Sequence, residues 1–315
     1  MTGPGRGSRR TGPRRKADRR GTVLPPFLDR LKTSLDSAWK AYKEEVKRCR
    51  KRPSETNIHN LRVAIRRFLS VLWLVRIAVA KAPLRSLKKK LRKQLEMLGP
   101  LRDIQVQIRL AGEFPVRAPS ARAFQTYLKK EESVALRKIQ KRSRRLRSGT
   151  FKAAAARVRK QYRRALADPR HHPDLETGIL DALRTALDRV VACYGEITVA
   201  DPFTVHRMRI ALKKLRYMVE AMAPILPGLP ASACDGMKAL QDQAGEIRDL
   251  ENLSRSLLSF CMSRGRTESG LAEAHRALVE RWQSDLQQFV NLPPEAHQAW
   301  KGLGECLREP ATAGK

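Results

Sequence analysis

One helical pattern occurs twice in this chain of 315 residues, and the repeat restricts the possible folds more than any other feature. Residues 58–69 match residues 205–216 in chemical type at nearly every position, at an offset of 147 residues, with Leu69 opposite Arg216 as the exception. Further along, residues 98–103 match residues 244–249 at an offset of 146 residues. A change of one residue fits in the loop between two helices, where insertions are tolerated. The repeat therefore predicts two pseudo-symmetric helical halves that pack together as one unit.

The spacing of apolar residues from Phe27 onward is helical, and stretches that alternate with a period of two are missing. Glycine and proline residues separate the helical stretches. We expect helices over residues 27–51, 55–81, 84–111, 119–147, 151–167, 174–197, 203–223, 231–262 and 267–291. The helix over 84–111 should break near Gly99, and the helix over 231–262 near Gly245. The chain is therefore predicted to be all-α.

The composition divides the chain into three regions. Residues 1–22 are mostly Gly, Pro, Ser and Arg, and they contain too few apolar side chains to order, so we expect a disordered basic tail. Residues 23–292 should form the helical domain, with a first half over 23–168 and a second half over 174–292. For residues 293–315 we expect a C-terminal extension with at most a short capping helix.

The net charge indicates the class of partner. The 65 Lys and Arg residues against 31 Asp and Glu residues give a formal charge of +34. Such a charge repels itself unless anions are bound or the charge is spread widely, so a polyanionic partner is the first expectation. Nucleic acid, an anionic membrane surface and inorganic polyphosphate all fit the charge alone.

The cysteines and the hydropathy favour a soluble cytoplasmic protein. The five cysteines are far apart and form no C-x-x-C pair, so we expect neither a disulfide framework nor a zinc site. No apolar run reaches the length of about 18 residues that a membrane span needs, so we expect no membrane span. The oligomeric state cannot be inferred from these features.

The first repeated motif places a row of basic side chains beside the core face of its helix. At 100° per residue, Leu61, Ile65, Phe68 and Leu72 form one stripe, and the basic row lies beside it. The basic rows of the two copies are His59, Arg62 and Arg66, and His206, Arg209 and Lys213. Each row spans about 10 Å, which suits successive groups of an extended anion. A solvated helix face is the alternative interpretation, but the repetition and the absence of acids in both rows argue against it.

Other charged residues near the motifs receive different interpretations. Arg92 aligns with Lys238 at the offset of 146 residues, and Lys88 and Lys89 add charge to the first copy. The Arg-Asp pairs at 102–103 and 248–249 follow a glycine, so we interpret them as structural residues at a helix restart. The two histidines have no second metal ligand at a suitable spacing, so we predict no metal site. Pairing of the histidines with the nearby Glu55 and Asp201 stays open.

With these motifs, H-x-x-R-x-x-x-[RK]-[RK] at His59 and His206 and L-G-x-x-R-D at residues 98–103, the sequence resembles the CHAD family, the conserved histidine α-helical domain. The resemblance covers roughly residues 25–292, and Ala244 departs from the leucine of the second motif. It implies two antiparallel four-helix bundles related by a pseudo-two-fold axis, a basic channel between them, and binding of inorganic polyphosphate, often at polyphosphate granules. The candidate polyphosphate-binding residues are His59, Arg62, Arg66, Arg67, Lys88, Lys89, Arg92, His206, Arg209, Lys213, Lys214, Arg216 and Lys238.

Two other functions compete with polyphosphate binding. Nonspecific nucleic-acid binding is the stronger one, because any cationic groove releases counterions. Against it, only 5% of the residues are aromatic, and none of them lies in the two basic rows, where bases would stack. A phosphohydrolase is less favoured, because the chain has no G-x-x-x-x-G-K-[ST] loop and no cluster of carboxylates for a metal ion. We therefore predict a binding protein without catalytic residues or a cofactor, in which the histidines strengthen anion binding as the pH falls.

Overall fold

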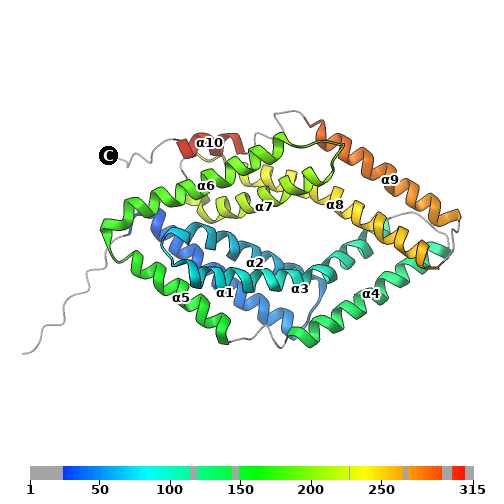
Figure 1. Ribbon diagram of the computed structural model, residues 1–315, viewed down its shortest axis with the longest axis horizontal. Coiled ribbons are helices and arrows are strands. Elements are labelled where there is room, and N and C mark those ends of the chain that lie inside the picture. The colour runs from blue at the N-terminus through cyan, green and yellow to red at the C-terminus, as the bar shows by residue number, and fades with distance from the viewer. Residues whose placement is uncertain are drawn as a thin grey trace, which may run out of the picture.

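The computed structural model describes residues 24–113, 119–143, 149–226, 228–264, 269–292 and 300–308. All regular elements in these ranges are helices, which confirms the predicted all-α class (Figure 1). The α-helices are α1 (Pro26–Lys51), α2 (Glu55–Leu74), α3 (Lys81–Glu113), α4 (Pro119–Ser143), α5 (Gly149–Ala165), α6 (His172–Gly195), α7 (Phe203–Met222), α8 (Ala233–Arg264), α9 (Ser269–Val290) and α10 (Lys301–Arg308). Short 3-10 helices, η1 (Val75–Ile77), η3 (Pro169–His171) and η4 (Ala223–Ile225), lie at the ends of the helices. The predicted basic tail lies outside the described residues.

The two halves of the sequence meet through their repeated helices. The α2 helix packs against α7, and α3 packs against α8, while α1 and α6 flank the pair (Figure 1). One apolar cluster joins both halves, because Leu61 and Phe68 of α2 and Met208 and Leu212 of α7 are all fully buried in it. The halves are therefore packed as one unit. The assignment of a separate four-helix bundle to each half stays a prediction.

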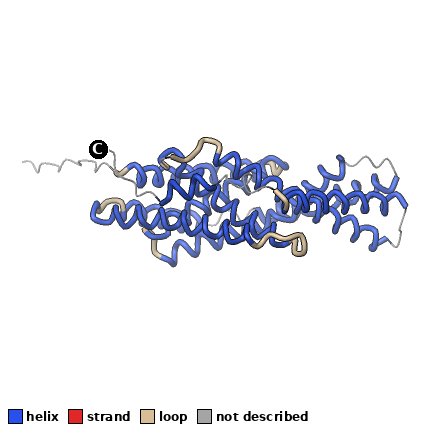
Figure 2. Tube along the Cα trace, turned by 90° about the horizontal axis from the view of Figure 1, so that it is seen from above, coloured by secondary structure: helices blue, strands red, loops and turns tan. Residues whose placement is uncertain are grey.

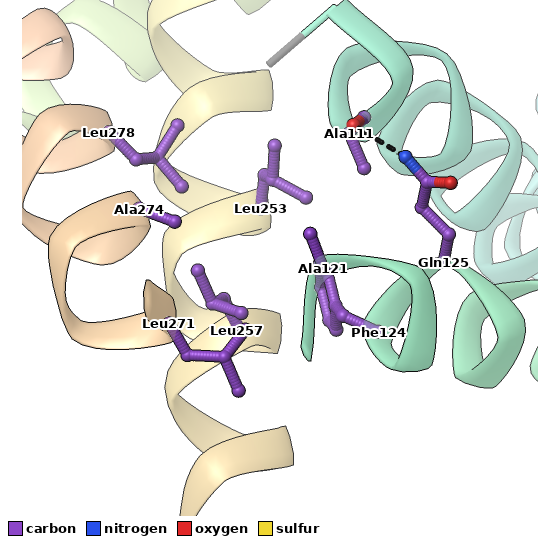
Figure 3. A pocket seen from close by; sticks show the side chains of 9 residues that line it. All are labelled: Ala111, Ala121, Phe124, Gln125, Leu253, Leu257, Leu271, Ala274 and Leu278. Carbon is purple, nitrogen blue, oxygen red and sulfur yellow. Dashed lines mark hydrogen bonds between the residues drawn. The ribbon is translucent and has the colours of Figure 1, made fainter. Parts of the chain in front are cut away.

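A second apolar cluster lies at one end of the molecule. It joins the C-terminal parts of α3 and α8 to α4 and α9, with Val106, Phe124, Leu253 and Leu278 as members (Figures 1 and 2). A small apolar cavity of about 30 Å³ lies at this junction, beside the hydrogen bond from the Gln125 amide to the Ala111 carbonyl oxygen (Figure 3). Its size and apolar walls make it a packing gap.

The α3 and α8 helices run without a break through the glycines at which the sequence predicts one. The α3 helix contains Pro100 as well as Gly99, yet Leu98 and Leu101 are fully buried on either side of them. Burial of these leucines keeps the segment helical, since tertiary packing outweighs the low helix propensity of Gly and Pro. The prediction that the following Arg-Asp pairs begin new helices is therefore wrong.

The C-terminal helix belongs to the helical body. The α10 helix packs on α6, and Trp300, Leu303 and Leu307 join the main apolar cluster. The Arg184 guanidinium donates to the carbonyl oxygen of Leu307, which fixes the end of α10. The α5 helix packs on α1 in the corresponding place of the first half. Residues 300–308 thus continue the repeat.

None of the described helices combines the length and the apolar character that crossing a bilayer requires.

Candidate functional site

Local sequence fixes which face of α2 is left for function. Ser54 caps the helix by accepting the Asn57 backbone N–H, at 3.3 Å. The fully buried Ile58, Leu61 and Ile65 then turn one face into the core. His59, Arg62 and Arg66 lie beside that face, because three and four residues along a helix return to nearly the same side.

The basic rows of α2 and α7 come together. Burial lowers the pKa of Lys213 to about 6, and Arg66, Arg209 and Arg62 lower it further because their positive charges lie close by. Burial, Arg62 and Arg209 act in the same direction on Arg66, whose pKa falls to about 10. Side chains separated by some 150 positions therefore share one electrostatic environment. We call the assembly the central cluster, and its basic members are His59, Arg62, Arg66, Arg102, His206, Arg209, Lys213 and Arg248.

The glycines of the second motif make room for two of these arginines. The Nη1 of Arg62 donates to the carbonyl oxygen of Leu95 on α3, at 3.1 Å. A Cβ atom on Gly99 would lie 3.6 Å from the same Nη1. In the second half, a Cβ atom on Gly245 would lie 3.0 Å from Nη2 of Arg209 and 3.2 Å from its Nε. In both halves the arginine of the first motif therefore lies next to the glycine of the second motif, and the contact is closer in the second half.

Hydrogen-bonding capacity is left over in the central cluster. No described residue accepts from the buried Nε of Arg209 or pairs with the buried Nδ1 of His206. Buried polar groups are normally paired, and cations crowded together at reduced solvent contact repel one another. An anion bound here would accept hydrogen bonds from the unpaired groups and would reduce the repulsion between the cations.

Two arginines and two aspartates of the second motif also belong to this site, although the sequence analysis assigned them a structural role. Arg102 and Arg248 lower the pKa values of His59 and His206, respectively, after burial of the rings. Burial raises the pKa of Asp103 and of Asp249, against the pull of nearby arginines, and Asp103 further raises that of Asp249. Their repetition at the offset of 146 residues was the signal that could have placed them here.

The histidines are held in the neutral form by their surroundings. Burial lowers both pKa values, and the neighbouring cations lower them further. The possible acidic partners are engaged elsewhere, since Glu55 pairs with Arg102 at 2.6 Å and Asp201 accepts the Phe203 backbone N–H. The Phe203 ring packs on His206, with centroids 5.5 Å apart. Each histidine can therefore gain a proton when an anion arrives.

The comparisons with known proteins agree with this architecture. The family model of the CHAD domain matches residues 32–258, which is more than half of the chain. The chain belongs to the CHAD family. The structure of a CHAD domain from the plant Ricinus communis has a TM-score of 0.59 and 17% identity, over 89% of this chain and 92% of that one. PptA from Streptomyces chartreusis has a TM-score of 0.61 and 15% identity, over 88% of this chain and all (100%) of that one. The sequence matches none of the curated proteins.

Several predicted site residues of this CHAD domain lie beside the central cluster rather than in it. Lys88 and Lys214 place their ammonium groups 4.1 Å and 3.7 Å from the centroid of the Trp73 ring. Arg76 lies 5.3 Å from the same ring, and Arg92 acts electrostatically on both lysines. We call this set the Trp73 group, and its members are Trp73, Arg76, Lys88, Arg92 and Lys214. Lys89 is exposed on α3.

Three other predicted residues are bound to acids. Arg216 is buried, with 8% of its side chain exposed, and it pairs with Glu220 and with the Gln241 amide oxygen. The structure places it in the core, and its assignment as a ligand-binding residue stays a prediction. Arg67 also reaches Glu220, at 3.5 Å, and Lys238 pairs with Asp242 at 3.3 Å.

The remaining features of the CHAD domain do not offer a better anion site. A cavity of about 570 Å³ lies between α1, α2 and α7, but its lining mixes Arg30 and Arg67 with Glu45 and Glu220. Among the described residues, no group of three or more His, Cys, Asp and Glu side chains is placed to hold a metal ion. The cysteines of these ranges are all free thiols.

Proposed function

We propose that this protein binds inorganic polyphosphate on the central cluster, between α2, α3, α7 and α8. The observation that carries the proposal is the environment of Lys213, a half-buried amino group whose nearest charged neighbours include Arg66, Arg209 and Arg62. A chain of phosphates brings one negative charge on nearly every unit, so it can neutralise several of these cations at once. Arginine forks suit phosphate oxygens because they donate two parallel hydrogen bonds.

Two further observations support polyphosphate over other anions. The chain belongs to the CHAD family, and the resemblance of its motifs to that family implies polyphosphate binding. The site is also built from two copies of one motif, which suits a ligand that repeats a single chemical unit. We propose that the two rows line a basic channel and that binding brings the protein to polyphosphate granules in the cytoplasm. A fluorescent fusion that fails to overlap with stained granules would contradict the localisation.

The proposed role is binding without chemistry. Asp103 and Asp249 are acids of the proposed site, and the positive charges of the surrounding arginines act on both carboxyl groups. Phosphate release during incubation of polyphosphate with the protein and Mg²⁺ would overturn this part of the proposal.

The test compares a variant of the central cluster with a charge-matched control. Arg66→Ala/Lys213→Ala removes one arginine and one lysine from the site. Arg157→Ala/Lys160→Ala removes the same two residue types from the exposed face of α5. We expect the first pair to lower polyphosphate affinity by roughly a hundredfold and the control to stay within about twofold, because buried charge contacts are worth more than exposed ones. Equal losses in both variants would contradict the site.

Nonspecific nucleic-acid binding is the second candidate, and the formal charge of +34 favours it. Competition decides between the two, with polyphosphate and single- or double-stranded DNA supplied at equal charge and fixed salt. We expect polyphosphate to displace DNA. Displacement of polyphosphate by DNA would support the second candidate.

A further inference from the structure

We propose that the polyphosphate chain leaves the central cluster in one direction, over the Trp73 group, and that acidic residues close the pseudo-equivalent exit. This inference rests on the proposed function and deepens it. The two halves repeat the same helices, so a symmetric site would offer two equal exits. The contacts on the two sides of the site differ, and the difference gives the bound chain a direction.

All the charged members of the Trp73 group are basic. Burial lowers the pKa of Lys88 to about 8, and Arg92, Arg76 and Lys214 lower it further. Burial also lowers the pKa of Lys214, followed by Arg76 and Arg92. No acid contributes to either shift. The Trp73 ring holds the ammonium groups in place by cation–π contacts, which leave their charge uncompensated.

Acidic residues partly neutralise the pseudo-equivalent side. Lys214 corresponds to Arg67 at the offset of 147 residues, and Trp73 corresponds to Glu220. The contact of Lys214 with an aromatic ring thus becomes an ion pair between Arg67 and Glu220, at 3.5 Å. Glu220 pairs with Arg216 as well, so one carboxylate holds two arginines.

The α8 helix continues this neutralisation. Lys88 corresponds to Cys234 at the offset of 146 residues, and Arg92 corresponds to Lys238. Lys238 pairs with Asp242 at 3.3 Å, whereas Arg92 forms no such ion pair among the described residues. Glu220 and Asp235 both raise the pKa of Cys234, after burial of the thiol. An anion that approaches from this side meets carboxylates where the other side presents ammonium groups.

The Trp73 group continues directly from the central cluster. Arg62 of α2 donates to the carbonyl oxygen of Leu95 on α3. On α3, Arg92 lies about one turn before Leu95, and Lys88 lies one further turn before Arg92. At a rise of 1.5 Å per residue, Lys88 and Leu95 are about 10 Å apart along the helix. On α7, Lys213 belongs to the central cluster and Lys214 to the Trp73 group. A chain that fills the central cluster therefore reaches the Trp73 group without crossing a neutral gap.

The experiment removes the same residue types at pseudo-equivalent positions. Arg92→Ala/Lys214→Ala changes the Trp73 side, and Arg67→Ala/Lys238→Ala is the matched control on the other side. Affinity is measured for tripolyphosphate and for long-chain polyphosphate at one salt concentration. For long chains we expect the first pair to lose roughly tenfold in affinity and the control to stay within about twofold, since the control cations are already paired. Tripolyphosphate should bind both variants like the unchanged protein, because it fits within the central cluster.

A third variant tests the closed exit. Asp242→Asn removes the acid that pairs with Lys238 and keeps an amide oxygen that can still accept the hydrogen bond from the Gln241 amide, which in turn accepts from Arg216. We expect a higher affinity for long chains and an unchanged affinity for tripolyphosphate. Equal losses in the two matched pairs, or equal losses for short and long chains, would overturn the direction of binding. Failure of the unchanged protein to bind any polyphosphate would overturn the proposed function instead.

Discussion

Arg209 rests against Gly245 of the neighbouring helix, so closely that a Cβ atom on the glycine would lie 3.0 Å from Nη2 and 3.2 Å from Nε. The corresponding pair in the first half is looser, since a Cβ atom on Gly99 would lie 3.6 Å from Nη1 of Arg62. The second copy of the motif therefore leaves less space between the glycine and its arginine than the first copy does. Replacement of the two glycines by alanine should therefore have different effects on binding.

Gly245→Ala is expected to weaken polyphosphate binding without unfolding the protein. The added methyl group displaces the Arg209 guanidinium, while alanine favours the helix by up to about 1 kcal/mol over glycine. We expect a loss of affinity of several-fold together with an unchanged or raised melting temperature. Gly99→Ala is the control, and its affinity should stay within about twofold. Calorimetric titration and thermal unfolding of the same samples give both quantities, and similar affinities of the two variants would contradict the argument.

Binding is expected to take up protons through Lys213. In the free protein its pKa is about 6, so the group is largely neutral at pH 7. A bound polyanion favours the charged form and raises the pKa, so affinity falls as the pH rises above 6. Titration calorimetry in buffers of different ionisation enthalpy measures the proton uptake directly. Lys213→Met should remove most of it, and an unchanged uptake in this variant would exclude Lys213 as its source.

The histidines are expected to add to this pH dependence. Burial and the neighbouring cations lower the pKa values of His59 and His206, so both rings are neutral in the free protein at pH 7. A polyanion reverses the effect of the cations, and binding should therefore strengthen as the pH falls from 8 to 6. His59→Ala/His206→Ala should make the fall of affinity with rising pH less steep, with the contribution of Lys213 left in place. The same slope in the double variant and in the unchanged protein would dismiss the histidines.

Sequence periodicity predicted the helices well because burial follows helical spacing. The stripe of Leu61, Ile65 and Phe68 is fully buried. The predicted breaks at Gly99 and Gly245 were wrong, because the sequence does not show how far packing of buried neighbours such as Leu98 and Leu101 keeps the segment helical. At Gly245 the glycine leaves room for the Arg209 guanidinium of another helix instead of forming a turn.

The site was harder to predict than the fold. The repeat indicated His59 and His206 with their rows, since a pattern that recurs in register is visible without a structure. Whether a cation is available depends on its neighbours in space. Arg216 lies within the same motif, yet Glu220 and Gln241 bind it in the core. Conversely, Trp73 lies outside both motifs, and only its contacts with Lys88 and Lys214 place it next to the site.

Arg216→Ala is expected to destabilise the fold rather than to weaken binding specifically. The substitution leaves the Glu220 carboxylate without its buried partner and removes the contact with the Tyr217 ring, at 4.4 Å. Breaking a buried pair by removing one partner costs about 3 kcal/mol or more. Urea unfolding measures the loss. Arg216→Ala/Glu220→Gln should recover part of it, and an equally unstable double variant would show that the ion pair is not the cause.

Lys213→Met is expected to stabilise the free protein, most strongly at low pH. The folded-state pKa of about 6 lies below the unfolded value of 10.5. Between these two pH values Lys213 is protonated in the unfolded chain and neutral in the folded protein. The cost of this mismatch is largest below pH 6 and shrinks as the pH rises towards 10.5. Methionine fills a similar volume without charge, so we expect a gain of about 1–3 kcal/mol at pH 6 and a smaller gain at pH 9. Urea unfolding at the two pH values provides the comparison. An equal gain in unfolding free energy at pH 6 and pH 9 would show that Lys213 stays protonated in the folded protein, although Arg66, Arg209 and Arg62 lie close to it.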